Sequence, residues 1–461
     1  MEFLSLFGSR RVPVIAGAEA AGAELRAEAA VAVSAIADAP RPASPARRLM
    51  RVLGPGLVTG ASDDDPSGIA TYSQVGAQFG YAMGWAVLLS YPLMAAIQEV
   101  SARIGCVTGR GIAANIRRYY SPGLLRFVVA LLLAANIVNL GADIGAMGSA
   151  LSLLIGGPVP LYALGFGLLC ILLQIFCSYA RYAAVLKWLS LSLLAYVAAM
   201  FAAQVSWRDA FAGTFMPRLE FGPQQITALV ALLGTTISPY LFFWQSSQEV
   251  EELRSRYRVK PLAISRVRAD AELKRIRLDT LTGMGFANLI ALFIMVTSAA
   301  TLHAHGITAI ASSAEAAEAL RPIAGPLTSA LFAAGIVGTG LLAVPVLAGS
   351  AAYALGEACR WPVGLARRPT EAKAFYGTIA VATLLGVALN AAPLDPIRAL
   401  YWAAVVNGVL APPLMAVMMV MASNPKIMGR LALPLSLRIA GWAATAVMGL
   451  TVAGMLLSWL D

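Results

Sequence analysis

Charged residues are scarce in this chain. Asp, Glu, Lys and Arg together make up 13% of its 461 residues, whereas hydrophobic residues make up 59%. A soluble domain cannot bury that much apolar surface, so the composition predicts an all-α protein that crosses a lipid bilayer many times. The expected spans are about eleven, at residues 54–79, 82–106, 126–155, 158–178, 182–204, 224–248, 280–303, 325–355, 373–392, 396–421 and 435–459.

Histidine and cysteine are also rare. The two histidines, His303 and His305, fall in a predicted external loop, and their spacing alone is weak evidence for a metal site. The four cysteines form no CxxC or His-paired pattern and are expected to be small apolar packing residues. No HExxH or GxSxG motif lies in a span, which argues against a membrane enzyme, and no cofactor is expected.

The basic charge has a topological interpretation. The net charge is +10, but of the 34 Lys and Arg residues only Arg208, Arg218, Arg321 and Arg398 fall outside the segments assigned to the cytoplasm. By the positive-inside rule the N-terminus is cytoplasmic and the C-terminus external, in the inner (plasma) membrane. The charge therefore indicates no nucleic-acid partner, and no obligate protein partner is evident.

The chain divides into two halves of five spans and one extra helix. Residues 1–45 are Ala-rich without a signal-peptide core, and we expect a disordered cytoplasmic arm or a mis-assigned start. The expected divisions are a first repeat at 46–205, an external loop at 206–223, a second repeat at 224–421 with a cytoplasmic loop at 249–279, and a last helix at 422–461. An odd number of spans per half gives the two repeats opposite orientations. The charged 249–279 loop is typical of a solvated amphipathic helix.

Two apolar segments are interrupted at matching places. Asp63, Asp64 and Asp65 lie within the first segment, before Pro66, and Pro239 breaks the second. A charged side chain at bilayer depth costs about 2.5–3.5 kcal/mol on insertion scales, so three acids there indicate function. Paired broken segments of this kind mark the centre of inverted-repeat secondary transporters.

The two breaks offer oxygen ligands. Asp65 before Pro66 is a helix cap, but a cap alone does not require an anion at this depth. Unwound backbone there is tolerated where it lines a cavity. The predicted ligands are the Asp65 carboxylate, the carbonyls of Ser62 and Thr235, and the hydroxyls of Ser67, Ser238 and Tyr240, with Asp63 and Asp64 as weaker candidates. Such a set suits a hard cation, and on chemistry alone Mg²⁺, Na⁺ and Ca²⁺ all stay open. No thioether or imidazole favours a softer metal.

These residues carry a family resemblance. The stretches DPSGIATYSQVGAQFGY, IQEVSARIGCVTGRG and ALLGTTISPYLFFWQSS resemble the Nramp family of divalent-metal transporters. The resemblance covers most of residues 50–460 and implies a LeuT-like fold of the APC superfamily, a 5+5 inverted repeat with broken helices 1 and 6 and a metal site between them. Two departures stand out. The usual Asp-Pro-Gly-Asn reads Asp65-Pro66-Ser67-Gly68, and Met-Pro-His reads Ser238-Pro239-Tyr240. Gly68, at the position of the usual asparagine, is therefore also counted among the predicted metal-site residues. This pattern resembles the Nramp-related magnesium transporters, a branch taken to carry Mg²⁺ and Mn²⁺ at a wider site.

The resemblance also bears on proton coupling. Asn136 and Ala146 replace acids expected on the third helix, only Asp143 is retained, and Gln245 replaces a histidine late in the sixth. With few titratable groups near neutral pH, uncoupled uptake driven by the membrane potential is favoured. The alternatives are a proton-coupled Mn²⁺ or Fe²⁺ importer using Asp143, and a Na⁺-coupled symporter of organic solutes.

Four residues are possible accessory ligands: Asp64, Asp143, Gln245 and Asn407. Asp143 belongs to a proton path or pairs with an Arg on a neighbouring helix. Asn407 makes an interhelical hydrogen bond or contacts the ion. Glu99 is expected to pair with Arg103 one helical turn later.

Overall fold

The computed structural model describes residues 55–176, 194–217, 222–257, 266–321, 325–391 and 395–460, and every regular element in these ranges is helical. The longer helices are α3 (Pro55–Asp63), α4 (Pro66–Phe79), α5 (Gly84–Thr108), α6 (Ile112–Tyr119), α7 (Pro122–Ile155), α8 (Val159–Phe176), α10 (Leu194–Ala202), α11 (Trp207–Phe215), α12 (Pro223–Thr236), α13 (Pro239–Tyr257), α14 (Arg266–Thr301), α17 (Thr328–Cys359), α18 (Lys373–Leu389), α19 (Pro396–Ala422) and α21 (Leu435–Ser458). Short turns of helix connect them at η1 (Gly80–Met83), η3 (His303–His305), α15 (Ser313–Glu318), η4 (Gly325–Leu327), α20 (Pro425–Met428) and η5 (Gly429–Leu431).

Helix starts follow sequence signals. Proline occupies the first turn of α4, α7, α12 and α19, where its missing N–H costs nothing. Asp65, Ser121 and Asp395 precede three of these prolines, and each side chain accepts a hydrogen bond from a free backbone N–H of the first turn. Proline therefore sets where these helices begin, and the polar residue before it satisfies the exposed donors.

Eight described helical stretches are long and apolar enough to cross a membrane. They are Pro66–Thr108, Pro122–Ile155, Val159–Phe176, Pro223–Arg254, Ala269–His305, Gly325–Cys359, Pro396–Ala422 and Leu435–Ser458, and Lys373–Leu389 is a shorter apolar helix. The predicted span at 54–79 is two helices, and most of the predicted span at 182–204 lies outside the described residues. Leu161, Leu168 and Leu172 of α8 are 60%, 46% and 52% exposed, as expected of side chains that face lipid.

Several predicted boundaries differ from the structure. The amphipathic helix expected within 249–279 is in fact the end of α13, which runs to Tyr257, and the start of α14, which begins at Arg266. Its solvated character is also wrong at those ends, because the side chains of Glu249 and Asp279 are fully buried. The expected loop at 206–223 contains α11. Cys106 and Cys170 are buried as predicted, whereas Cys359 is exposed at the end of α17, and Cys177 lies outside the described residues.

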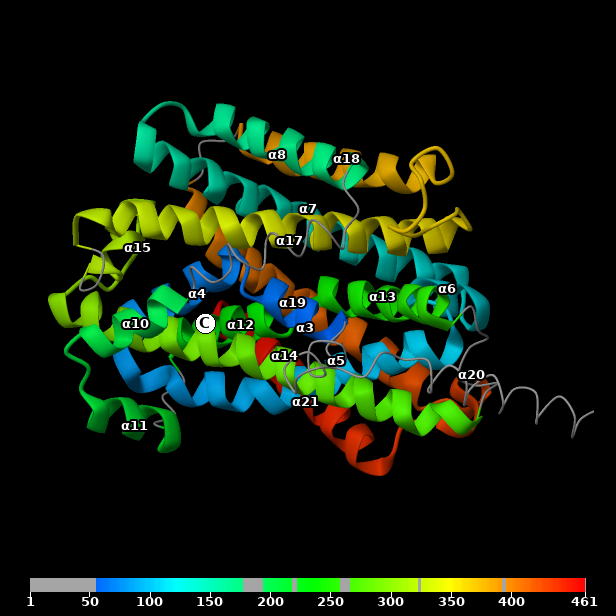
Figure 1. The fold of residues 1–461 in the computed structure, drawn as a ribbon. Helices are drawn as coiled ribbons and strands as arrows, with labels where there is room; N and C mark the ends of the chain where they lie inside the picture. Colours follow the sequence, from blue (N-terminus) through cyan, green and yellow to red (C-terminus); the bar gives the residue numbers. More distant parts are fainter. Residues whose placement is uncertain are drawn as a thin grey trace, which may run out of the picture. The chain divides into compact units, whose positions relative to one another are not determined.

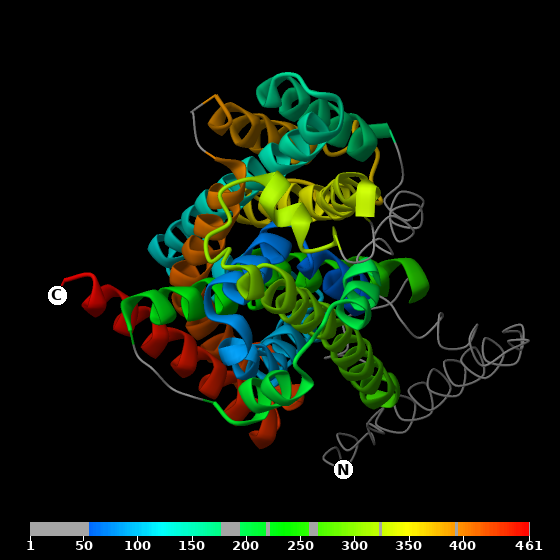
Figure 2. The ribbon, with the colours of Figure 1, turned by 90° about the vertical axis from the view of Figure 1, so that its left-hand side faces the viewer.

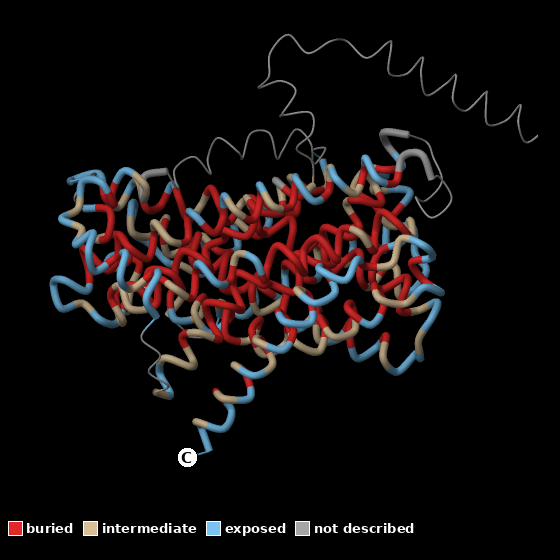
Figure 3. Tube along the Cα trace, turned by 90° about the horizontal axis from the view of Figure 1, so that it is seen from below, coloured by how far each residue is buried: buried red, intermediate tan, exposed pale blue. Residues whose placement is uncertain are grey.

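The two pairs of short helices lie at the centre of the bundle. In Figure 1, α3, α4, α12 and α13 are surrounded by α5, α14, α17 and α19, while α7, α8 and α18 form an outer group that Figure 2 also places together. Buried residues concentrate along the middle of this bundle and exposed ones on its periphery (Figure 3). Helices that carry polar breaks are thus shielded from lipid by complete helices.

Glycines bring two of the broken helices very close to their neighbours. A Cβ on Gly60 of α3 would lie 2.3 Å from the carbonyl oxygen of Gly283 on α14. A Cβ on Gly234 of α12 would lie 2.1 Å from the Ala404 carbonyl oxygen on α19. Small residues at such crossings let membrane helices pack backbone to backbone. These contacts fix where the ends of α3 and α12 lie.

Candidate metal site at the two helix breaks

The first break is short and built around Asp65. Helix α3 ends at Asp63 and α4 begins at Pro66, with Asp65 extended at φ −72°, ψ 172°. Its Oδ1 accepts hydrogen bonds from the Gly68 N–H and from the Ser67 hydroxyl, both at 2.7 Å. The predicted cap is therefore confirmed, and it points one carboxylate oxygen at the first turn of α4.

The second break faces the first. Helix α12 ends at Thr236 and α13 begins at Pro239. The Ser238 hydroxyl reaches back to the carbonyls of Gly234 and Thr235, at 3.0 and 2.8 Å, and so caps the last turn of α12. Ser238 thus uses its proton within the break and keeps only its oxygen lone pairs for another partner.

Tyr240 joins the two breaks. Its hydroxyl lies 3.1 Å from Asp65 Oδ2 and 3.1 Å from the carbonyl oxygen of Ser62. The Thr235 hydroxyl oxygen lies 3.3 Å from where a Cβ on Gly68 would stand. The predicted ligands Asp65, Ser62, Ser67, Gly68, Thr235, Ser238 and Tyr240 all lie at these two facing breaks, and the side chains among them are at most 2% exposed.

Gly68 is tightly surrounded. A Cβ there would lie 3.3 Å from the carbonyl oxygen of Asp63, from the Thr235 hydroxyl and from the Tyr72 ring. Replacing the family's usual asparagine by glycine therefore opens no free room on this side of α4.

Three other buried acids lie around Asp65, and several of their carboxylate oxygens have no hydrogen-bond partner. These oxygens are Oδ1 of Asp63 and both carboxylate oxygens of Asp64 and of Asp143. Asp143 of α7 is close enough to Asp65 for the two to repel each other, as are Asp63 and Asp64. Among the described residues, no Lys or Arg lies within ion-pair distance of these acids, so the predicted Asp143–Arg pair is not formed there. Such a concentration of carboxylates needs a cation or protons to be stable.

Asn407 has a structural partner. Its side-chain amide and that of Asn139 on α7 exchange two hydrogen bonds, at 2.7 and 3.2 Å. Of the two predicted roles, the interhelical hydrogen bond is the one found. Glu99 and Arg103 also pair as predicted, at 2.7 Å.

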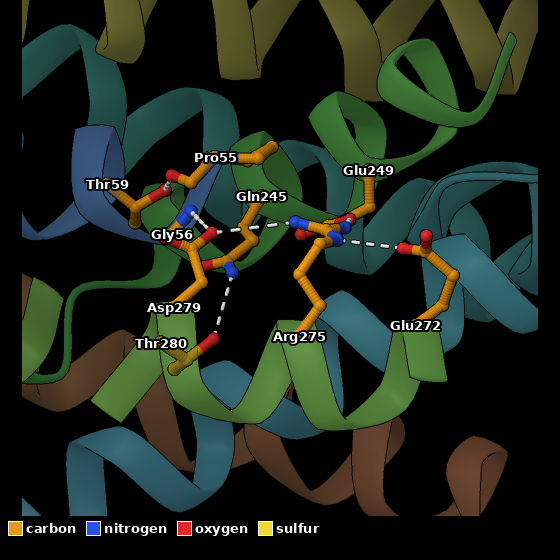
Figure 4. Close-up of polar contacts among 9 residues, drawn as sticks. All are labelled: Pro55, Gly56, Thr59, Gln245, Glu249, Glu272, Arg275, Asp279 and Thr280. Carbon is orange, nitrogen blue, oxygen red and sulfur yellow. Dashed lines mark hydrogen bonds and ion pairs between the residues drawn. The ribbon is translucent and has the colours of Figure 1, made fainter. Parts of the chain in front are cut away.

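Gln245 faces a different network from the ion site. Its side-chain oxygen accepts from Gln98 at 2.7 Å, and its amide donates to Thr280 at 3.2 Å. Beside it, Arg275 of α14 contacts Glu249 and Glu272 at 2.7 Å and Asp279 at 3.8 Å (Figure 4). Sequence reasoning missed this buried cluster because it treated the whole charged stretch as solvated. The signal available was the i, i+4 spacing of Arg275 and Asp279 beside the following apolar run.

A cavity of about 490 Å³ lies beyond the site, between α4, α12, α19 and α21. Its wall includes Ala70 and Gln74 of α4, the first two turns after Ser67. Arg398 is the charged residue of the lining, and Gln74, Gln78 and Gln224 are its amides. The site is thus buried, and a recess lined by both polar and apolar side chains lies along the same helix, α4.

The remaining metal-ligand candidates do not form a site. His303 contacts the Ala77 carbonyl oxygen at 2.8 Å, and His305 contacts that of Thr301. No group of three or more His, Cys, Asp or Glu in the described part of the chain is arranged to hold a metal. An ion at the breaks would therefore depend on backbone and hydroxyl oxygens together with Asp65.

Comparisons with known proteins identify the family. Residues 56–458 match the family model described as natural resistance-associated macrophage protein-like, Nramp. A divalent metal cation transporter MntH of Deinococcus radiodurans is 27% identical over 415 residues, covering 87% of this chain and 88% of the relative. One of the same name from Verminephrobacter eiseniae is 29% identical over 370 residues, covering 77% and 82%.

Solved structures identify the fold. A manganese transporter of Eremococcus coleocola superposes with a TM-score of 0.71 at 16% identity, over 92% of this chain and 90% of that one. The nucleobase-cation-symport-1 transporter Mhp1 gives a TM-score of 0.53 at 15% identity, over 88% and 92%. The predicted all-α, LeuT-like fold is confirmed. With the family model matched over nearly all of residues 55–460, the chain belongs to the Nramp family.

Proposed function

We propose that this chain is a secondary transporter that imports divalent metal ions, Mg²⁺ and also Mn²⁺, through a site between the two helix breaks. Divalent cation transport is supported by family membership and by relatives named as divalent metal cation transporters. The observation that carries the site is the meeting of Asp65, Ser62 and Tyr240 across the breaks, in the middle of unpaired buried acids. A divalent cation is the species that such a negative, oxygen-rich centre would stabilise.

The donor set supports a hard ion. Every candidate ligand at the breaks offers oxygen: the Asp65 carboxylate, the carbonyls of Ser62 and Thr235, and the hydroxyls of Ser67, Ser238 and Tyr240. Ser238 supplies a hydroxyl where the softer thioether of methionine is usual in the family, which supports placing the chain with the Nramp-related magnesium transporters. An ion bound beside Asp65 would take the Ser67 or Tyr240 oxygen once that O–H had turned away from the carboxylate.

Transport without obligatory proton coupling is part of the proposal. Gln245 cannot titrate, and its amide is occupied by Gln98 and Thr280. Asn136, where an acid is usual, donates to the Leu347 carbonyl and to Ser350. A double charge moving through 100 mV gains about 4.6 kcal/mol, enough to drive uptake alone. We further infer a plasma-membrane location with a cytoplasmic N-terminus and an external C-terminus, from the distribution of Lys and Arg.

A proton-coupled Mn²⁺ importer is the second candidate, and one observation favours it. Asp143 is fully buried beside Asp65, and neither of its carboxylate oxygens has a hydrogen-bond partner. That is the environment of a carboxyl that could carry a proton across. A Na⁺-coupled symporter of organic solutes is less favoured, because three acids would repel a carboxylate substrate.

Uptake into proteoliposomes under an imposed potential tests the proposal. Mg²⁺ and Mn²⁺ uptake is measured with a pH dye inside the vesicles. We expect uptake of both ions without acidification. Mn²⁺ uptake with acidification and no Mg²⁺ flux would replace the proposal by the proton-coupled alternative.

A further inference from the structure

A second cavity, separate from the helix breaks, lies where α6, α13 and α17 contact one another. These three helices are labelled in Figure 1. The cavity encloses about 290 Å³ and is walled by the turn before α6, one face of α13, the end of α17 and the residues that follow it. We call it the arginine cavity, because Arg110, Arg117, Arg254 and Arg360 all line it.

None of the four arginines forms an ion pair with a described residue, although Glu357 attracts Arg117 and Glu251 attracts Arg254 over longer distances. Among the described residues, no carboxylate oxygen lies within 4.0 Å of any of their guanidinium nitrogens. Arg117 donates instead to the backbone carbonyl of Glu357. Partial burial, followed by repulsion from Arg360, lowers the pKa of Arg117. Like charges are therefore held close together around one concavity.

The two acids in the wall are occupied elsewhere. Glu251 accepts from the Tyr353 hydroxyl at 2.5 Å and from the Leu365 N–H at 2.9 Å. Glu357 accepts from the Ala114 N–H at 3.0 Å and from the Ser247 hydroxyl at 3.4 Å. Counting four arginines and two glutamates, the lining keeps an excess of two positive charges.

Arg360 is held in an unfavourable backbone conformation. With φ at +62°, it is the single non-glycine residue of positive φ among the described residues. It follows the last residue of α17, the position at which helices most often carry glycine because a side chain there is strained. Glycine would relieve that strain, so the backbone conformation does not explain why an arginine occupies this position.

We propose that the arginine cavity binds a phosphate-bearing anion. Arginine presents a planar fork of donors that matches phosphate oxygens, and basic pockets between membrane helices bind anionic lipid headgroups. Trp361, 38% exposed, lies in the same wall, and tryptophan is enriched at the membrane–water interface. The positive-inside rule explains only why arginines lie on one side of the membrane. It does not explain why four of them line the same cavity. The headgroup of an anionic phospholipid and a free phosphate share this chemistry.

Thermal unfolding of the full chain in neutral detergent tests the proposal. Tm is measured with added phosphatidylglycerol, with phosphatidylcholine and with inorganic phosphate, for the wild type and for Arg254→Gln, Arg360→Gly and Arg368→Gln. Arg368 is exposed and lies outside the cavity, so its variant is the matched control for loss of charge. We expect an anion to raise Tm in the wild type and the control, and about half of that shift or more to be lost in the two cavity variants.

Arg360→Gly separates binding from folding. It removes a guanidinium and relieves the positive φ, so Tm without added anion should stay the same or rise while the anion-dependent shift falls. A misfolded variant could not give that opposite pair of changes. A shift from phosphatidylglycerol alone would identify a lipid headgroup, and an equal shift from inorganic phosphate would identify a soluble phosphate; both support the site. Equal anion-dependent shifts in all four proteins would overturn it.

Discussion

The carboxylate of Asp279 accepts a hydrogen bond of 2.8 Å from the backbone N–H of Gly56, 223 residues earlier in the chain (Figure 4). Gly56 is in the first turn of α3, whose N–H groups have no partner within the helix. An acid at a helix N-terminus also complements the helix dipole. Asp279 therefore anchors the start of the first broken helix to α14, and Arg275 in turn lies between Asp279 and Glu249 of α13.

Removing Arg275 should be strongly destabilising. Arg275→Met leaves the buried Glu249 and Asp279 without their shared cation, and breaking a buried ion pair from one side costs about 3–5 kcal/mol. The measurement is Tm in detergent. Arg321→Met is the control, since the Arg321–Glu318 pair is 73% and 43% exposed and should contribute about 0–1 kcal/mol. If Tm falls by a similar amount in both variants, the buried cluster contributes no more to stability than an exposed ion pair.

Asp65→Asn should abolish transport without unfolding the protein. Asparagine caps helices about as well as aspartate, so the hydrogen bond from Gly68 is retained while the charge that attracts the ion is lost. Mg²⁺ uptake and Tm are measured together. Asp395→Asn is the matched control, because Asp395 caps α19 in the same way but lies away from the helix breaks. Persisting Mg²⁺ flux in Asp65→Asn would disprove the site.

The sequence predicted those residues of the candidate site that interrupt an apolar run, because such an interruption is visible in the local sequence. Asp65 and Tyr240 were predicted at the breaks because a charge and a proline interrupt an apolar run, and interrupted segments at two matching places indicate paired broken helices. The reciprocal pair of Asn139 and Asn407 was half predicted, since a polar residue in a span suggests a hydrogen bond but not its partner. Partner choice depends on which helix faces meet, and spacing within one helix does not reveal that.

The buried ends of the 249–279 stretch show the opposite case. High charge density predicted solvent exposure, yet Glu249 and Asp279 are buried because Arg275 and the N–H of Gly56 compensate them. Compensation comes from helices far apart in the chain, so local composition gave the wrong environment. The arginine cavity escaped prediction for the same reason: its four arginines come from three separate segments.

Ser238→Met should shift selectivity toward softer ions. A thioether at the second break favours Mn²⁺ and Cd²⁺ over Mg²⁺, which binds oxygen ligands. Competition of Mn²⁺ and Cd²⁺ with Mg²⁺ uptake is the measurement. Ser238→Ala separates the added sulfur from the loss of the cap on the Thr235 carbonyl. If alanine and methionine change selectivity equally, or neither changes it, the interpretation of Ser238 as a hard-ion determinant is wrong.

The Asn139–Asn407 pair offers a test of whether Asn407 contacts the ion. Asn407→Leu leaves the buried Asn139 amide without one partner, which costs about 1–3 kcal/mol. Asn139→Leu should cost a similar amount. The double variant should recover much of the combined loss, because two apolar groups replace a satisfied polar pair, and Tm values of the four proteins give the coupling energy. Mg²⁺ uptake is measured alongside. If the double variant is stable and still transports Mg²⁺, Asn407 serves helix packing; if it is stable but inactive, the amide oxygen is needed by the ion as well as by Asn139.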